Sequence, residues 1–195
     1  QSAPINPADI QTYQRDQWSR EVTPCDIAAA HPDDPERVAT GVARAAVDLE
    51  AARIACHAAV LADPENPRLN YQLARVYGYS GRHAEGEPFR MAALKAGYPQ
   101  SLFVFGFIRL TGWDGAPADP CLGGELIRLS AHAGRFAGLV GYPHYAVSGA
   151  FDGCGIQIDK TELLGFLDRA DAASDDFYKD ILIAQLRHRV EALED

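Results

Sequence analysis

Apolar residues recur three and four positions apart in the stretch 66–97, a spacing that gathers side chains on one face of a helix. Asn66 can cap the start of a first helix, and the proline after it has a fixed φ that suits the first helical position. The apolar side of this helix consists of Leu69, Leu73, Ala74 and Tyr77. Gly81 permits a turn, and the second helix carries Phe89, Ala93 and Gly97 at spacing four. The stretch therefore predicts a pair of antiparallel helices.

Small residues line the seam that these two helices would share. They are Ala74, Ala92, Ala93 and Ala96. Small side chains let two helix axes approach closely, whereas large ones hold them apart. We therefore expect a hairpin whose faces also pack against neighbouring hairpins.

The hairpin pattern returns later in the chain. A shift of 37 residues superimposes 97–112 on 134–149, and a shift of 32 lays Leu73 and Ala74 on Phe105 and Gly106. A period in the thirties with one helix pair per period is typical of a helical solenoid. Each hairpin of a solenoid needs its neighbours, because it cannot cover its own apolar side.

These positions resemble a known repeat family. The first copy carries Leu73, Ala74, Tyr77, Gly81, Phe89, Ala92, Ala93 and Gly97, and the second runs from Phe105 and Gly106 through Gly112, Gly115 and Asp119 to Leu122 and Ala131. The pattern resembles the SEL-one-like branch of the tetratricopeptide repeats over residues 66–155. The preceding stretch 37–56 resembles an N-terminal segment of secreted bacterial members. The resemblance implies a protein-binding scaffold without catalysis.

The expected architecture is all-α: a right-handed solenoid of helical hairpins, an α-α superhelix, with terminal capping helices. An N-terminal arm would occupy residues 1–24 and a single repeat domain residues 25–195. The expected repeats are 35–65, 66–98, 99–135 and 136–175, followed by a capping helix at 176–193.

Several helix boundaries outside the central hairpin are also predicted. Asp34, Pro35 and Glu36 supply a cap, a first-position proline and a first-turn acid, so we expect a helix from Pro35 to Ala46. A short helix is expected at 25–30 and a longer one at 48–62. Asp159 and Glu162 predict a capping box. The last helix, 176–192, would place Phe177, Ile181, Ile183, Leu186 and Val190 on its apolar side.

The arm has few apolar anchors, among which Trp18 is expected to pack against the first helices. The alternative is an extended arm that adds to a partner.

Charge narrows the class of partner. The 195-residue chain has a formal net charge of -9 and contains no Lys/Arg cluster, which argues against nucleic-acid binding. A basic or neutral protein is an easier partner electrostatically. No apolar run approaches the ~18 to 20 residues of a membrane span, so no membrane insertion is expected.

The four cysteines indicate an oxidising compartment. Sequence alone allows three pairings, of which we favour Cys25 with Cys56 and Cys121 with Cys154, because helices that return side by side place residues about one period apart at similar heights. Four buried thiols in a cytosolic protein are the alternative. The first residue is Gln and the opening is polar, as after removal of a signal peptide, although a trimmed chain would look the same. We therefore expect a periplasmic or secreted bacterial protein.

No motif in the sequence predicts catalysis or a cofactor. The six histidines are scattered without a metal-binding pattern, and no nucleophile elbow or phosphate-binding glycine loop occurs. His132 and His144 could meet across a hairpin, but no acidic residue lies near either in sequence. The sequence thus predicts a non-enzyme without metal or cofactor.

The expected functional surface is the inner face formed by the first helices of successive hairpins. Aligning the copies places Arg68, Tyr71, Arg75, Gln100, Phe103, Phe107, Val140 and His144 on this face. Aromatic and arginine side chains are favoured at interface centres. The two arginines could hold a carboxylate of the partner, while Phe103 and Phe107 could equally belong to the core.

Together these features predict an adaptor or accessory subunit that binds another protein or a peptide segment, and a larger envelope complex is a setting that suits such a subunit. A small-molecule or peptide carrier is the alternative. An enzyme with an unrecognised site is a further one.

Overall fold

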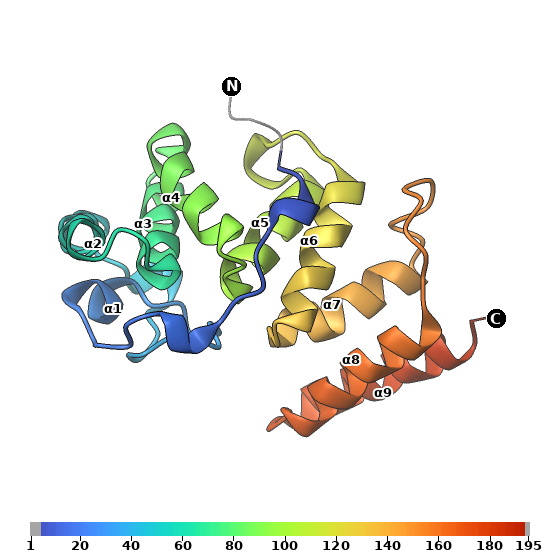
Figure 1. The fold of residues 1–195 in the computed structure, drawn as a ribbon. Helices are drawn as coiled ribbons and strands as arrows, with labels where there is room; N and C mark the ends of the chain where they lie inside the picture. The colour runs from blue at the N-terminus through green and yellow to red at the C-terminus, as the bar shows by residue number, and fades with distance from the viewer. Residues whose placement is uncertain (1–4, 194–195) are drawn as a thin grey trace. The chain divides into compact units, whose positions relative to one another are not determined.

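The computed structural model describes residues 5–193, except for the side chain of Asp114. Within these residues all regular structure is helical (Figure 1). The α-helices are α1 (Pro24–Ala29), α2 (Leu49–Ala62), α3 (Pro67–Tyr79), α4 (His83–Lys95), α5 (Pro99–Thr111), α6 (Pro120–His132), α7 (Phe136–Val147), α8 (Lys160–Ala172) and α9 (Phe177–Glu191). Short 3-10 turns are η1 (Pro7–Asp9), η2 (Arg15–Gln17), η3 (Arg44–Ala46) and η4 (Trp113–Gly115).

The predicted all-α class is confirmed. Helices pack on their chain neighbours, α2 on α3, α3 on α4, α6 on α7, α7 on α8 and α8 on α9, which is the packing of a helical solenoid. The chain divides into two compact units, residues 1–101 and 102–195, each of which is described by itself.

In the first unit, α1 lies on both α2 and α3. Cys25 and Ala29 of α1 are fully buried with Cys56 of α2 and Leu73 of α3. A disulfide joins Cys25 to Cys56, with 4.4 Å between their Cα atoms. The core of this unit is therefore closed by its most N-terminal helix.

In the second unit, the core lies among α6, α7, α8 and α9. Fully buried members include Ile127, Tyr142, Leu163 and Val190. A second disulfide, Cys121 to Cys154, ties the start of α6 to the glycine-rich turn after α7. Both predicted cysteine pairings are thus confirmed.

Side-chain caps start the helices where the sequence predicted them. Asp48, Asn66 and Asp176 each accept a backbone N–H of the first turn of α2, α3 and α9. Asp159 does the same for α8, but Glu162 does not complete the predicted capping box, since its carboxylate accepts from Arg128 of α6 at 2.9 Å.

Glycines allow the close approach of helices that the small-residue pattern predicted. A Cβ on Gly106 of α5 would lie 2.9 Å from Ile127 of α6, and one on Gly123 would lie 2.5 Å from the Leu110 amide. In the first unit, Gly86 of α4 meets Tyr77 of α3 in the same way. These helix pairs therefore have no room for a larger residue at the contact.

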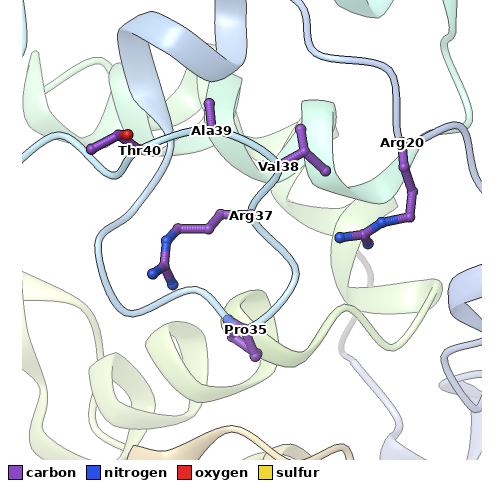
Figure 2. Close-up of a pocket in the computed structure, with 6 residues that line it drawn as sticks. All are labelled: Arg20, Pro35, Arg37, Val38, Ala39 and Thr40. Atoms are coloured by element: carbon purple, nitrogen blue, oxygen red, sulfur yellow. The ribbon is translucent and has the colours of Figure 1, made fainter.

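The predicted helix from Pro35 to Ala46 is wrong: the segment is a loop that ends in η3 (Figure 2). Its backbone bonds to the preceding chain, with the Val42 amide donating to the Ala30 carbonyl at 2.8 Å. Gly41 packs directly on the backbone of Pro32. These contacts with the preceding chain override the local start signal, so residues 35–65 contain one α-helix, α2, preceded by η3.

The predicted apolar side of α9 is correct only in part. Ile183, Leu186 and Val190 are buried, but Phe177 and Ile181 are exposed. Leu186 follows Ile183 by three residues and Val190 follows Leu186 by four, so these three share one face of α9. Phe177 and Ile181 do not fit this spacing.

Candidate functional site

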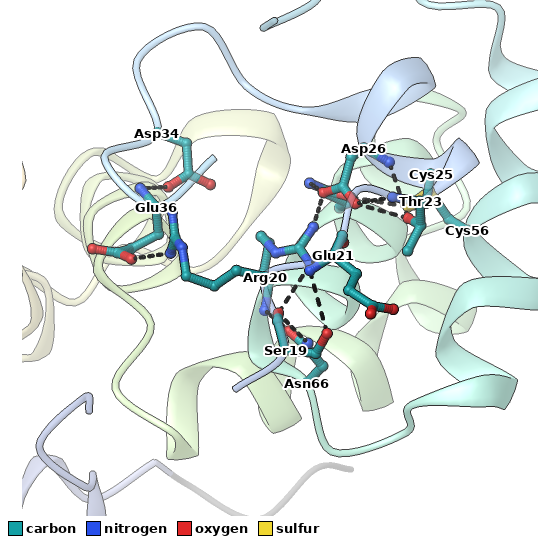
Figure 3. A network of polar contacts seen from close by, with 12 residues as sticks. Ser19, Arg20, Glu21, Thr23, Cys25, Asp26, Asp34, Glu36, Cys56 and Asn66 are labelled. Carbon is teal, nitrogen blue, oxygen red and sulfur yellow. Dashed lines mark hydrogen bonds and ion pairs between the residues drawn. A yellow bond between two sulfur atoms is a disulfide. The ribbon is translucent and has the colours of Figure 1, made fainter. Parts of the chain in front are cut away.

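The face of α3 that was predicted to bind a partner is covered by the chain's own N-terminal segment. Arg68, Tyr71 and Arg75 are all buried, with exposed fractions of 3%, 6% and 7%. Figure 3 shows Ser19, Glu21, Asp26 and Asn66 brought together over this part of α3. The structure thus surrounds Arg68 and Arg75 with residues 19–42, while the Tyr71 ring lies against Tyr98 with 5.7 Å between centroids.

Arg68 binds both a carboxylate and main-chain carbonyls. Its guanidinium forms an ion pair with the fully buried Asp26. Its Nη2 donates to the carbonyls of Ser19 and Glu21, at 3.2 Å each. Burial lowers the pKa of Arg68, and a buried cation of this kind needs a paired acid and further acceptors.

Arg75 binds main-chain carbonyls on both sides of the loop. Its Nη1 donates to Ala29 at 2.7 Å and to Ala30 at 3.0 Å, and its Nη2 donates to Val42 at 2.7 Å. Its Nε donates to the Tyr79 hydroxyl at 3.0 Å. One guanidinium thereby holds two separate stretches of the N-terminal segment.

A second polar cluster lies where this segment meets the end of the hairpin. The Tyr98 hydroxyl donates to the fully buried Asp34 at 2.7 Å. Glu36, with its side chain 8% exposed, accepts from Arg15 and from Arg20. Burial, reinforced by the nearby Asp34 carboxylate, raises the pKa of Tyr98 well above the ordinary tyrosine range.

The arm itself, residues 5–22, crosses the hairpin end in a mainly extended conformation (Figure 1). The Gln11 amide donates to the Lys95 carbonyl at 2.9 Å. The Tyr13 ring stands edge-on to Tyr98, with 5.5 Å between ring centroids. Trp18 is half-buried, and its packing against the first helices stays a prediction.

The loop 35–40 frames an open hollow of about 840 Å³ (Figure 2). Arg20, Arg37 and Thr40 contribute its polar lining. Arg37 donates to the Asp34 carbonyl at 3.0 Å and Arg20 pairs with Glu36, so both guanidiniums are engaged with the chain. The remaining lining residues, Pro35, Val38 and Ala39, are apolar.

The other predicted partner-binding residues have different surroundings. Gln100 is buried, with 1% exposed. Phe103 and Phe107 are half-buried and stacked at 6.3 Å between centroids, and the exposed Trp113 stands edge-on to Phe107 at 5.4 Å. His144 is exposed beside Tyr145. The role of these residues in partner binding stays a prediction.

Sequence reasoning missed the acidic members of the α3 site. Asp34 and Glu36 were placed at a helix start and Asp26 was given no role, yet the structure buries all three acids. Asp26 and Asp34 bind Arg68 and Tyr98, which lie 42 and 64 residues further along the chain, so these pairings depend on the path of the chain and no local signal indicates them.

Over residues 5–193, no group of three or more histidine, cysteine, aspartate or glutamate side chains could hold a metal ion. In that same range, no helix is long and apolar enough to cross a membrane. Comparisons with protein-family models, with curated proteins and with solved structures find no match for this chain.

Proposed function

We propose that this protein is a non-catalytic adaptor or accessory subunit that binds another protein through the faces of its helical hairpins. The observation that supports this is that α3 binds main-chain carbonyls of the N-terminal segment, both from its irregular parts and from the end of α1. Arg68 and Arg75 donate together to five main-chain carbonyls, those of Ser19, Glu21, Ala29, Ala30 and Val42. Every residue offers a carbonyl, so this recognition suits polypeptide in general.

The accessible binding surface of the proposed adaptor lies in the second unit. It consists of Phe103, Phe107, Trp113 and His144. Arg135 stands over the Phe103 ring at 5.3 Å, so the aromatic group is already ordered before a partner arrives. Ordered aromatic side chains lose little entropy on binding, which is why they dominate interface energetics.

We further propose that the chain belongs with the SEL-one-like repeats and works in the periplasm or outside a bacterial cell. The two disulfides support the oxidising compartment, because such bonds rarely persist among cytosolic thiols. An accessory subunit of an envelope complex would fit both the proposed repeat family and the oxidising compartment.

Affinity capture from the native host with the tagged full-length protein tests the adaptor function. Replacing Phe107 and His144 with Ala should lower capture of a specific protein by roughly 30-fold, the loss of about 2 kcal/mol expected of an interface anchor. Tyr178→Ala is the matched control, because Tyr178 is an exposed aromatic residue of the same unit. Equal capture by the wild-type protein, the Phe107 and His144 variant and the Tyr178 control, each with unchanged melting temperature, would refute the proposed surface.

A further inference from the structure

We propose that the arm is an exchangeable ligand of the first unit. The site beneath it takes an extended segment of a partner protein that carries an aromatic residue two positions before an arginine. This inference rests on the proposed adaptor function, for which it names a partner chemistry. The arm supplies the template, with Tyr13 and Arg15 at that spacing.

The arm is bound without being buried. None of residues 5–22 belongs to the buried class, whereas Cys25, Asp26 and Ala29 of α1 are fully buried. The Cys25–Cys56 disulfide fixes α1 just beyond the arm. Lifting of the arm therefore leaves the disulfide and the Arg68–Asp26 ion pair in place. It removes the Ser19 and Glu21 carbonyls from Arg68, so the main chain of an occupant must supply acceptors in their place.

The site recognises the main chain at Gln11. The Gln11 amide donates to the Lys95 carbonyl, one of the acceptors left open at the end of α4. Gly97 has φ +69, and a Cβ there would collide with the Gln11 carbonyl oxygen. A partner segment can make the same backbone contacts, because they require no particular side chain.

The side chains on either side define the partner's chemistry. The Tyr98 ring lies at 81° to the Tyr13 ring in a T-shaped contact. Glu36 accepts Arg15 bidentately, with Nε at 2.9 Å and Nη2 at 2.6 Å from its two oxygens. Arg20 adds a second cation to Glu36 at 2.9 Å. A carboxylate as buried as this one needs a cation, so an occupant that displaces the arm must supply an arginine.

Charge favours the same class of occupant. The arginine side chains that pair with Glu36 are themselves 54% and 40% exposed, so they reach the carboxylate from outside the core. The protein carries a net charge of -9, which attracts a basic segment over longer range.

The test uses the full-length chain with a weakened arm, in which Tyr13, Arg15 and Arg20 are replaced by Ala. A fluorescent synthetic peptide of residues 8–22 is the probe, and binding is followed by anisotropy. We expect at least tenfold tighter binding to the weakened-arm chain than to the wild-type chain, whose own arm competes. A peptide with Tyr13→Ala and Arg15→Ala should bind at least tenfold more weakly.

Two variants of the weakened-arm chain locate the binding. Glu36→Gln should reduce peptide affinity at least tenfold, whereas Glu50→Gln, an exposed acid paired with Arg53 in the same unit, should leave it unchanged. Equal binding of both peptides, or no effect of Glu36→Gln, would overturn the proposal.

A second measurement applies if the weakened-arm chain does not fold. In the wild-type chain, saturating peptide should accelerate hydrogen exchange of the arm amides, including that of Gln11. An unchanged rate of hydrogen exchange would mean that the peptide does not displace the arm, and would overturn the proposal. Sedimentation tests whether the occupant is a different protein. If the wild-type chain forms a concentration-dependent dimer, the occupant is the arm of a second copy, and the proposal of a different partner protein is overturned. Capture through Phe107 and His144 concerns the other unit, so either proposal can fail alone.

Discussion

Asp34 has no exposed surface, yet its carboxylate is well accommodated. Its Oδ2 accepts from the Tyr98 hydroxyl, and its Oδ1 accepts from the Glu36 amide at 2.9 Å. A buried carboxylate that loses a donor keeps its desolvation penalty without compensation. The stability of the first unit should therefore depend strongly on this one hydroxyl.

We predict that Tyr98→Phe lowers the free energy of unfolding by about 1 to 3 kcal/mol, because it leaves a buried acceptor unsatisfied. Urea denaturation measures the change. Tyr178→Phe, which removes the hydroxyl of a residue 78% exposed, should change stability by less than about 0.5 kcal/mol. Equal effects of the two substitutions would contradict the role assigned to the Tyr98 hydroxyl.

The buried tyrosines also predict a loss of stability at alkaline pH. Burial raises the pKa of Tyr71 and Tyr98 above the ordinary value, and raises that of Tyr142 to about 12. In the unfolded chain tyrosine ionises near pH 10, so above that pH the unfolded state binds fewer protons than the folded state. The buried tyrosines therefore leave the free energy of unfolding undiminished below about pH 10. Above that pH it decreases as pH rises through the folded-state pKa values, by up to about 1.4 kcal/mol per pH unit for each tyrosine.

Urea midpoints at pH 9, 10 and 11, with tyrosinate absorbance recorded in parallel, measure this dependence. We expect the urea midpoint to be lower at pH 11 than at pH 10. We also expect the buried tyrosines to ionise only when the protein unfolds. Full ionisation of all tyrosines near pH 10 in the folded protein would contradict it.

Among the elements, the seam between α5 and α6 depends on glycine. Gly106 and Gly123 face each other's helices, and the Gly123 position is closed by the Leu110 amide and the Gly106 carbonyl. Backbone atoms cannot move aside as the end of a flexible side chain can, so any added atom must separate the helices.

We predict that Gly123→Ala destabilises the second unit by about 1 to 3 kcal/mol through overpacking. Gly165→Ala, in α8, is the matched control, because nothing lies within 4 Å of its added Cβ. It should stabilise the helix by about 0.5 to 1 kcal/mol, since alanine loses less backbone entropy than glycine. Thermal unfolding should show a lower melting temperature for Gly123→Ala and a higher one for Gly165→Ala. Destabilisation by both variants would refute the claim that close contact at Gly123 causes the effect.

Helices governed by local signals could be predicted from the sequence. Asn66 with Pro67 and Asp176 mark helix starts whose caps form within a few residues of the chain. The segment after Asp34 carries equally good local signals, but Arg75 and the Ala30 carbonyl both bind Val42 and hold the segment as a loop. Those partners lie outside the segment, and no window of sequence around it contains their geometry.

The candidate site shows the same division. The helical spacing predicted the helix that carries Arg68, Tyr71 and Arg75, and their role in partner binding stays a prediction. The spacing could not show that the chain's own residues 19–42 occupy one face of this helix, because this depends on the path of a long irregular segment.

At the scale of the whole molecule, each unit has its own disulfide. Cys25–Cys56 lies within residues 1–101 and Cys121–Cys154 within residues 102–195. The bridged cysteines are separated by 31 and 33 residues, for which the chain-entropy model gives about 3 to 4 kcal/mol each.

We therefore predict that replacing Cys121 and Cys154 with Ser destabilises the second unit by about 3 to 4 kcal/mol. Hydrogen exchange of α6, α7 and α8 should accelerate, while that of α2 and α3 keeps its wild-type rate. The reciprocal variant, with Cys25 and Cys56 replaced, should reverse the pattern. Equal acceleration in both units by either variant would contradict local stabilisation.

The placement of the two bridges also sets how the molecule responds to tension. A chain pulled from its ends cannot extend the residues enclosed by an intact bridge. At roughly 3.4 Å per extended residue, the enclosed lengths are roughly 105 Å and 110 Å. A reductant added under constant force should lengthen the molecule in two discrete steps of these sizes, one for each bridge.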